Sequence, residues 1–195
     1  MDQPSNYQLR SAESRDVEAI VGLIRELAEF EELAHLVQAT PEKLWPHLFG
    51  ERPAAEALVV EVASARKPGT QTSNTADRHD ASTSGAEDRH DAQTTPPEIV
   101  GFALFFTNFS TFLTQPGLYL EDLYVRPAHR GQGIGEAVLT RLARLALERG
   151  YGRFEWSVLD WNENAIRFYE RMGATVMPDW RICRISGAAL DRFRT

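Results

Sequence analysis

The sequence predicts a mixed α/β fold, and three observations support this class. Residues 16–32 place apolar side chains three or four positions apart, as in a helix that packs along one face. Aliphatic and aromatic segments of strand length recur along the chain. One of these segments, 118–125, leads through a glycine-rich turn into a second helical pattern at 134–149 and then to a strand-like segment at 154–159. This last order is typical of a crossover between two parallel strands.

Each element has its own local signal. Ser14 or Asp16 is a candidate N-cap for the first helix, and Gly173 is expected to end the last one. The helical segments are predicted at 16–32, from Thr40-Pro41 through Leu48, at 134–149 and at 162–172. The strands are predicted at 7–10, 57–62, 99–106, 118–125, 154–159 and 180–185, the last of which closes the sheet.

Residues 66–97 interrupt this pattern between two predicted strands. They contain Ser, Thr, Asp, Ala and Gly without an aliphatic residue, and Asp77-Arg78-His79-Asp80-Ala81 recurs at 88–92. Such a segment buries too little surface to offset its ordering entropy. We predict a low-complexity, disordered insert in a hairpin, dispensable for the fold and the chemistry.

Composition narrows the class of protein. A length of 195 residues suits one domain, and a net charge of −7 argues against nucleic acid and favours cationic ligands. The single cysteine, Cys183, fits a reducing cytoplasm and is expected to be a packed strand residue. There is no apolar run of the ~18 residues that a membrane span needs, and no signal-peptide core. The five histidines show no metal-ligand spacing, so no metal is predicted.

The most informative motif is Arg130-Gly131-Gln132-Gly133-Ile134-Gly135, between a predicted strand and a predicted helix. Glycines at alternate positions let backbone N–H groups converge, and a helix N-terminus adds partial positive charge. The motif therefore predicts a pyrophosphate site. A P-loop is disfavoured because Glu136 stands where Lys-Ser/Thr is needed. A dinucleotide site with Glu155 as its acidic residue, or a glycine turn without a ligand, stays open.

The motif resembles the acyl-CoA signature of the GCN5-related N-acetyltransferases (GNAT). Further segments resemble the branch of diamine (spermidine/spermine) and thialysine N-acetyltransferases; these are 26–31 (ELAEFE), 119–122 (YLED), 158–162 (VLDWN), 168–169 (FY) and 173–174 (GA). The resemblance implies a single domain over residues 1–195 with a central, mixed, mostly antiparallel sheet flanked by helices. It also implies acetyl-CoA as co-substrate, a small cationic amine as acceptor, and a homodimer.

The resemblance assigns roles to individual residues. Tyr169 is the general acid for the CoA thiolate, and the backbone N–H of Leu123 stabilises the oxyanion. Glu121 is the base or substrate anchor, and Asp122 has a lesser structural or substrate role. The substrate-binding residues are Phe30, Glu31, Glu121 and Asp122. The cofactor-binding residues are Leu123, Tyr124, Val125, Arg130, Gly131, Gln132, Gly133, Ile134, Gly135, Glu136, Asn162, Ala165 and Tyr169.

The residues themselves leave plainer alternatives open. Glu31 extends the apolar stripe of the first helix with a carboxylate, which suits either a polar site or a frayed helix end in solvent. Asn162 and Tyr169 are two helical turns apart on one face, which also suits a helix cap and a core-covering ring. Glu121 and Asp122 are consecutive strand residues, so only a bulge would direct both to one groove.

The expected function is acetyl transfer to a primary amine by direct attack in a ternary complex. Phe30, Gln132 and residues 158–161 resemble the thialysine branch more than the polyamine branch. Two other functions remain open: a protein or peptide N-acetyltransferase, and a CoA-binding regulatory module without turnover.

Overall fold

The computed structural model describes residues 6–63 and 96–194. These residues form two compact units, and the division between the units lies between Trp156 and Ser157. The predicted insert at 66–97 therefore lies outside the described residues, except for its last two positions. The assignment of a single domain to residues 1–195 stays a prediction.

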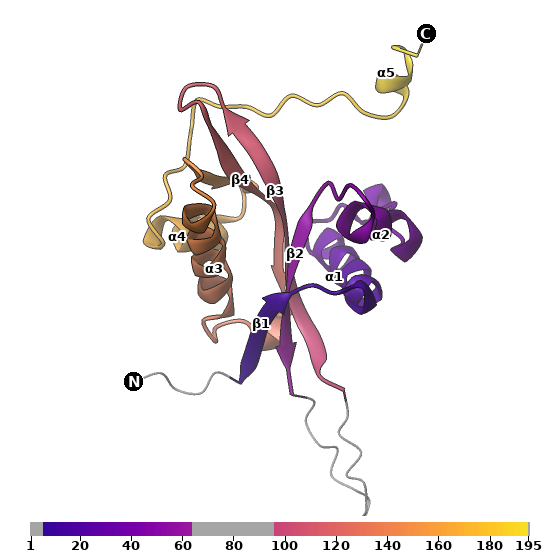
Figure 1. The fold of residues 1–195 in the computed structure, drawn as a ribbon, viewed down its shortest axis with the longest axis vertical. Coiled ribbons are helices and arrows are strands. Elements are labelled where there is room, and N and C mark those ends of the chain that lie inside the picture. The colour runs from indigo at the N-terminus through magenta and orange to yellow at the C-terminus, as the bar shows by residue number, and fades with distance from the viewer. Residues whose placement is uncertain (1–5, 64–95, 195) are drawn as a thin grey trace, which may run out of the picture. The chain divides into compact units, whose positions relative to one another are not determined.

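The first unit contains a five-stranded sheet in the order β1-β2-β3-β4-β5 (Figure 1). Neighbours from β1 to β4 are antiparallel, and β5 pairs with β4 in parallel. This confirms the predicted mixed, mostly antiparallel sheet. The strands are β1 (Tyr7–Ser11), β2 (Glu56–Val62), β3 (Glu98–Ser110), β4 (Gln115–Val125) and β5 (Phe154–Trp156).

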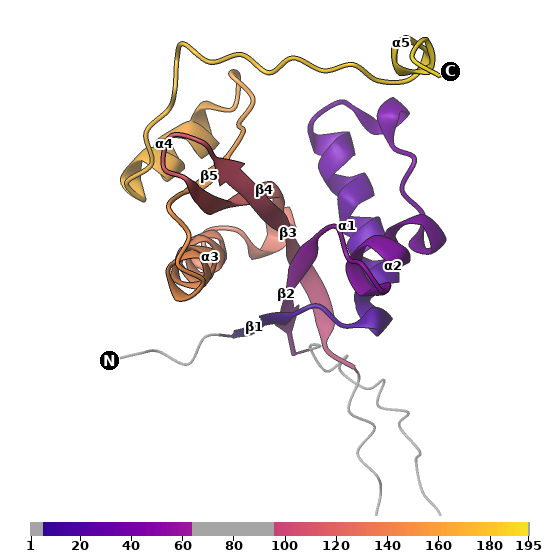
Figure 2. The ribbon, with the colours of Figure 1, turned by 45° about the horizontal axis from the view of Figure 1, so that its top comes forward.

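Three helices cover the two faces of this sheet. Figure 2 shows α1 (Val17–Phe30) and α2 (Pro41–Phe49) on one face and α3 (Ile134–Glu148) on the other. All three agree closely with the predicted segments. Short 3₁₀ turns lie at Ser14–Asp16, Ala34–Leu36 and Pro127–His129. Among the helices of the described residues, none has the length and hydropathy of a membrane span.

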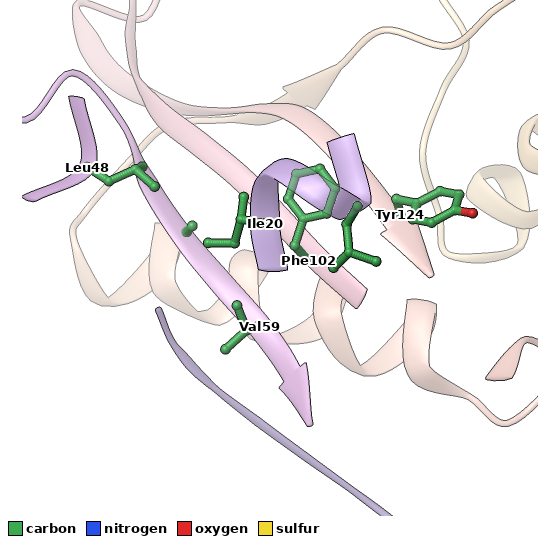
Figure 3. Close-up of a cluster of buried hydrophobic side chains, with 7 residues drawn as sticks. Ile20, Leu48, Val59, Phe102 and Tyr124 are labelled. Atoms are coloured by element: carbon green, nitrogen blue, oxygen red, sulfur yellow. The ribbon is translucent and has the colours of Figure 1, made fainter. Parts of the chain in front are cut away.

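The core between α1 and the sheet follows from the apolar stripe of the helix. Ile20 and Leu23 of α1 are fully buried against Val59 of β2 and Phe102 of β3. Tyr124 of β4 belongs to the same cluster, and Figure 3 shows its hydroxyl oxygen directed away from the other rings and aliphatic chains. The cluster thus joins α1 firmly to β4, the strand that leads into the glycine motif.

Asp16 precedes α1, but its side chain does not cap the helix. Its carboxylate instead accepts hydrogen bonds from Arg10 at 2.6 and 2.9 Å and from the Glu13 N–H at 2.7 Å. Glu61 of β2 also pairs with Arg10. Burial would raise the pKa of Asp16, but the bonds from Arg10 and Glu13 outweigh it and hold this pKa below its ordinary value.

The second unit begins with α4 (Glu163–Arg171) and contains a short helix, α5 (Ala188–Asp191). Asn162 caps α4, because its side-chain oxygen accepts from the Ala165 N–H at 3.2 Å. Gly173, with φ of 90°, follows the end of the helix as expected for a left-handed C-terminal glycine.

The strand predicted at 180–185 is wrong. These residues have no regular structure, and Trp180, Ile182 and Cys183 are exposed. The expectation that Cys183 is a packed strand residue is therefore also wrong. Alternating apolar residues form a strand only where a neighbouring strand satisfies their backbone groups, and no described residue pairs with this segment.

Candidate active site

The turn before α3 is built from two glycines in left-handed conformation. Gly131 has φ of 75° and Gly133, the N-cap of α3, has φ of 77°. L-residues adopt these angles at a free-energy cost, which explains why glycine stands at both positions. Because Gly133 has no side chain, it provides no cap for α3. Within the described residues, the N–H groups of Ile134, Gly135 and Glu136 donate to no protein acceptor.

Arg130 lies at the start of this turn with its charge unpaired by the described carboxylates. Its Nε donates to the carbonyl oxygen of Val125 at 2.8 Å. The guanidinium carbon lies 4.9 Å from the ring centre of Phe30 and 5.5 Å from that of Tyr124. These distances are typical of cation–π contacts. A fixed positive charge thus stands beside unpaired N–H groups at a helix N-terminus.

These features fit a pyrophosphate group. Free N–H groups and the helix dipole favour an anion, the absence of Cβ atoms gives it close access to the backbone, and Arg130 supplies a full charge. Two shallow hollows of about 530 and 740 Å³ flank the turn, one reaching Gly133 and Ala137, the other His129 and Gln132. The residues expected to hold the phosphates are therefore brought together in the structure.

A β-bulge separates the two acidic residues of β4. Asp122 lies opposite Leu104 of β3, and Leu120 lies opposite Phe105, so Glu121 has no opposing residue. An extra residue of this kind bends the strand and interrupts the strict alternation of side chains. Two consecutive strand residues such as Glu121 and Asp122 need a bulge of this kind if both side chains are to face one groove. Glu121 is exposed, whereas Asp122 is half-buried.

Asp122 and Glu31 form an acidic site with Glu121. Burial first, then the charges of Glu121 and Glu31, raise the pKa of Asp122 to about 6. Burial also raises the pKa of Glu31, which follows α1 as its C-cap. Glu31 is half-buried, which disagrees with the alternative of a frayed helix end that holds this carboxylate in solvent. No ion pair in the described part of the chain neutralises these three carboxylates. The arrangement suits a cationic ligand.

The remaining site candidates belong to the second unit. Asn162, Ala165 and Tyr169 lie on α4 or at its start, and Asn162 is occupied as the helix cap. Tyr169 is half-buried, and its ring centre lies 5.4 Å from that of Phe168. Their roles toward a cofactor stay predictions. In the ranges 6–63 and 96–194, no group of three or more His, Cys, Asp or Glu side chains could hold a metal ion.

One interaction beside the acidic site has no signal in the sequence. Arg126 donates from Nε and Nη2 to Glu26 of α1, at 2.8 to 3.1 Å, and from Nη1 to Glu98 of β3 at 2.6 Å. It joins the second half of α1 to the ends of β3 and β4. Glu26 and Arg126 are 100 residues apart in the chain, so no local pattern could have paired them.

Comparison with known proteins supports the same interpretation. Over 94% of its length, the chain is 38% identical to L-ornithine N5-acetyltransferase of Arabidopsis thaliana, covering 86% of that protein. It is 35% identical to thialysine N-epsilon-acetyltransferase of Mus musculus, covering 95% of this chain and 96% of that one. These relatives match the expected diamine and thialysine branch.

A solved structure supports the fold alone. An integron cassette protein of V. cholerae superposes with a TM-score of 0.66 at 20% identity, over 96% of each chain. Residues 31–174 match the Acetyltransferase (GNAT) family. The matched range includes the glycine motif and both acidic positions of β4. The chain belongs to the GNAT family of acetyltransferases.

Proposed function

We propose that this acetyltransferase transfers the acetyl group of acetyl-CoA to a primary amine of a small cationic molecule. The acceptor is a diamine, a polyamine or a thialysine-like amino acid. The proposal rests on the acidic site of Glu31, Glu121 and Asp122, where α1 ends and β4 bulges; among residues 6–63 and 96–194, none forms an ion pair with these carboxylates. An unpaired acidic site selects a cation, and a second ammonium group on the acceptor adds a second favourable contact. The relatives that act on ornithine and thialysine support this class of acceptor.

The co-substrate is acetyl-CoA, whose thioester supplies the acetyl group. Its pyrophosphate suits the free N–H groups of α3 and the guanidinium of Arg130. Residues Leu123, Tyr124 and Val125 of β4, together with Asn162 and Ala165, complete the proposed cofactor contacts.

The proposed reaction is direct attack in a ternary complex. The amine must lose its proton before its nitrogen can attack the thioester carbonyl. As the base, Glu121 accepts the proton that leaves the ammonium group; as the substrate anchor, it holds the amine while solvent water accepts that proton. Asp122 adds a negative charge beside it. The N–H of Leu123 donates to the oxyanion as it forms. When the carbon–sulfur bond breaks, Tyr169 gives its proton to the thiolate, and the acetylated amine and CoA are the products.

We expect Gly133→Val to raise the KM for acetyl-CoA about 10- to 100-fold, the equivalent of losing one hydrogen bond to a charged group. A β-branched side chain at a φ of 77° distorts the turn, and its methyl groups occupy the space of the phosphate. Steady-state kinetics with varied acetyl-CoA measures the effect. Gly150→Val is the matched control, because Gly150 has φ of 68° at the other end of α3.

Both substitutions are expected to cost about 1–2 kcal/mol of stability, from the left-handed backbone. Only the one at position 133 should change KM. An equal change in KM for both variants, or none for a folded Gly133→Val protein, would remove the turn from the cofactor site.

We expect Glu31→Gln to weaken binding of a dication more than that of a monocation. Putrescine should show a rise in KM of about tenfold and n-butylamine a change below twofold, since only the dication has a second charge for this carboxylate. Glu29→Gln is the control, because Glu29 is exposed on α1. A similar change for both amines would place Glu31 outside the acceptor site.

A further inference from the structure

One of the two hollows at the glycine turn continues past the turn, between α3 and the edge strand β1. It has a volume of about 530 Å³, within the range of about 300–1,000 Å³ that is typical of small-molecule sites. One face of α3 and one face of β1 line it, with Gly133, Ala137, Thr140, Arg144, Tyr7 and Leu9. The hollow lies entirely within the first unit and begins where the pyrophosphate is expected to bind.

The part of this hollow farthest from the turn carries positive charge. Arg144 forms no ion pair with the described residues, whereas Arg141, which also lines the hollow, pairs with Glu148 at 3.2 Å. Side chains on a helix lean toward its N-terminus, so the guanidinium of Arg144 is expected over Thr140. That position is about 10 Å along the axis from Gly133. A second phosphate of the same ligand can therefore reach Arg144.

The other hollow at the turn has a different lining. It reaches His129 and Gln132 and includes Glu61 of β2, and the described residues around it contain no arginine or lysine. A phosphate ester is therefore better accommodated in the hollow that contains Arg144.

The two ends of CoA leave its pyrophosphate in different directions. The pantetheine end has to follow β4, because the thioester must reach the Leu123 N–H and the acidic site. The other end is an adenosine with a 3′-phosphate, which needs a flat surface, a partner for the ribose and a cation. The hollow between α3 and β1 offers the ring of Tyr7, the carboxylate of Glu136 for the ribose 2′-hydroxyl, and the guanidinium of Arg144.

We infer that the hollow between α3 and β1 binds the adenosine 3′-phosphate end of CoA, with Arg144 as the contact of the 3′-phosphate. The inference rests on the proposed function, because it extends the pyrophosphate site of the turn. It adds the means by which the protein distinguishes CoA from a thiol that lacks the 3′-phosphate. Arg144 lies away from the reacting atoms, so it contributes to the affinity for the co-substrate and not to the transfer step.

Calorimetry with CoA and 3′-dephospho-CoA tests this site without turnover, because neither carries an acetyl group. We expect the natural protein to bind CoA about fivefold more tightly or better, since only CoA has a phosphate for Arg144. Arg144→Gln should reduce this ratio to below about twofold by weakening the binding of CoA alone. Arg25→Gln removes an exposed positive charge from α1, on the other face of the sheet, and should keep the ratio.

Ala137→Trp tests the place of the adenosine, because a large side chain at this half-buried position fills the hollow. We expect it to weaken the binding of CoA and of 3′-dephospho-CoA by about tenfold each, the equivalent of losing one stacked base. The affinity for 4′-phosphopantetheine, which has no adenosine, should stay within about twofold and shows that the variant is folded.

The outcomes separate the nucleotide site from the function itself. Equal affinity of the natural protein for CoA and 3′-dephospho-CoA, or an unchanged ratio in Arg144→Gln, overturns the site and leaves the proposed function standing. The same holds if Ala137→Trp binds CoA normally, or loses affinity equally for all three ligands. If the natural protein binds neither CoA nor 3′-dephospho-CoA, the proposed function itself fails.

Discussion

Tyr169→Phe is expected to lower the turnover number by about 10²- to 10⁴-fold, the usual contribution of a general acid, while the affinity for acetyl-CoA stays nearly unchanged. Phenylalanine keeps the aromatic ring of Tyr169, which packs beside Phe168 on α4, and removes only the hydroxyl. The thiolate then has to leave without a positioned proton donor. A purely structural tyrosine would instead show its effect in stability, with little change in turnover.

Single-turnover kinetics is the measurement for Tyr169→Phe, because it separates acetyl transfer from product release. Tyr151→Phe is the matched control, since the hydroxyl of Tyr151 forms a hydrogen bond with Thr107 at 2.8 Å in the first unit. The control should lose some stability and keep its rate. If Tyr169→Phe keeps more than about half of the natural rate of acetyl transfer, the proton comes from another donor, most simply water.

Asp122→Asn should have two opposite effects, a loss of activity and a gain of stability. We expect kcat/KM for a diamine to fall about 100-fold, because the acidic site loses its most buried charge, which lies next to the proposed base Glu121. In the protein with no ligand bound, this charge is unfavourable: burial and the charges of Glu121 and Glu31 raise the pKa of Asp122 from 3.8 to about 6. The natural protein should therefore lose kcat/KM as the pH falls below 6.

The pH dependence of stability follows from the sign of this shift. Since the pKa in the folded state lies above its ordinary value, protonation favours folding, and the unfavourable charge develops as the pH rises from 3.8 to about 6. This difference between the two pKa values corresponds to a destabilisation of the folded state by at most about 3 kcal/mol, and the partial exposure of Asp122 reduces this to about 1–2 kcal/mol. Asp122→Asn should thus be more stable than the natural protein at pH 7.5 and equal to it at pH 4.

Chemical denaturation at these two pH values measures the stability, and initial rates measure the activity. Asp160→Asn, at an exposed position of the second unit, is the control for removing one negative charge. A stability gain that does not depend on pH would show that Asp122 is not buried as a charge. Unchanged kcat/KM for the diamine would show that Asp122 lies outside the acceptor site.

The glycine turn and its flanking elements were predictable because their signals are local. Gly131 and Gly133 are needed for left-handed backbone, and the apolar spacing after them forms α3. The same holds for the N-cap of α4, where Asn162 bonds to the third residue of its own helix. For these elements, the residues that determine the geometry are within a few positions of one another.

Features that depend on distant partners were not predictable in this way. The bulge at Glu121 is defined by the register against β3, and alternation along β4 alone predicted Glu121 and Asp122 on opposite faces. The contact of Arg130 with Phe30 joins residues 100 positions apart, like the Glu26–Arg126 pair. The apolar alternation at 180–185 predicted a strand that has no partner among the described residues. The spacing of apolar residues indicates which side chains share a face of a helix or strand. Whether a segment forms a strand also depends on a neighbouring strand with which it can pair.

The proposed activity is acetyl transfer from acetyl-CoA to a small amine that has a second charged group. The direct measurement is product analysis by mass spectrometry, with release of the CoA thiol followed in parallel. Thialysine, L-ornithine, putrescine, n-butylamine and a lysine peptide are compared at equal concentration. We expect N-acetylated thialysine, ornithine or putrescine with one CoA released per product, and little product from n-butylamine or the peptide. Acetylation of the peptide alone, or CoA binding without thiol release for any amine, would contradict it.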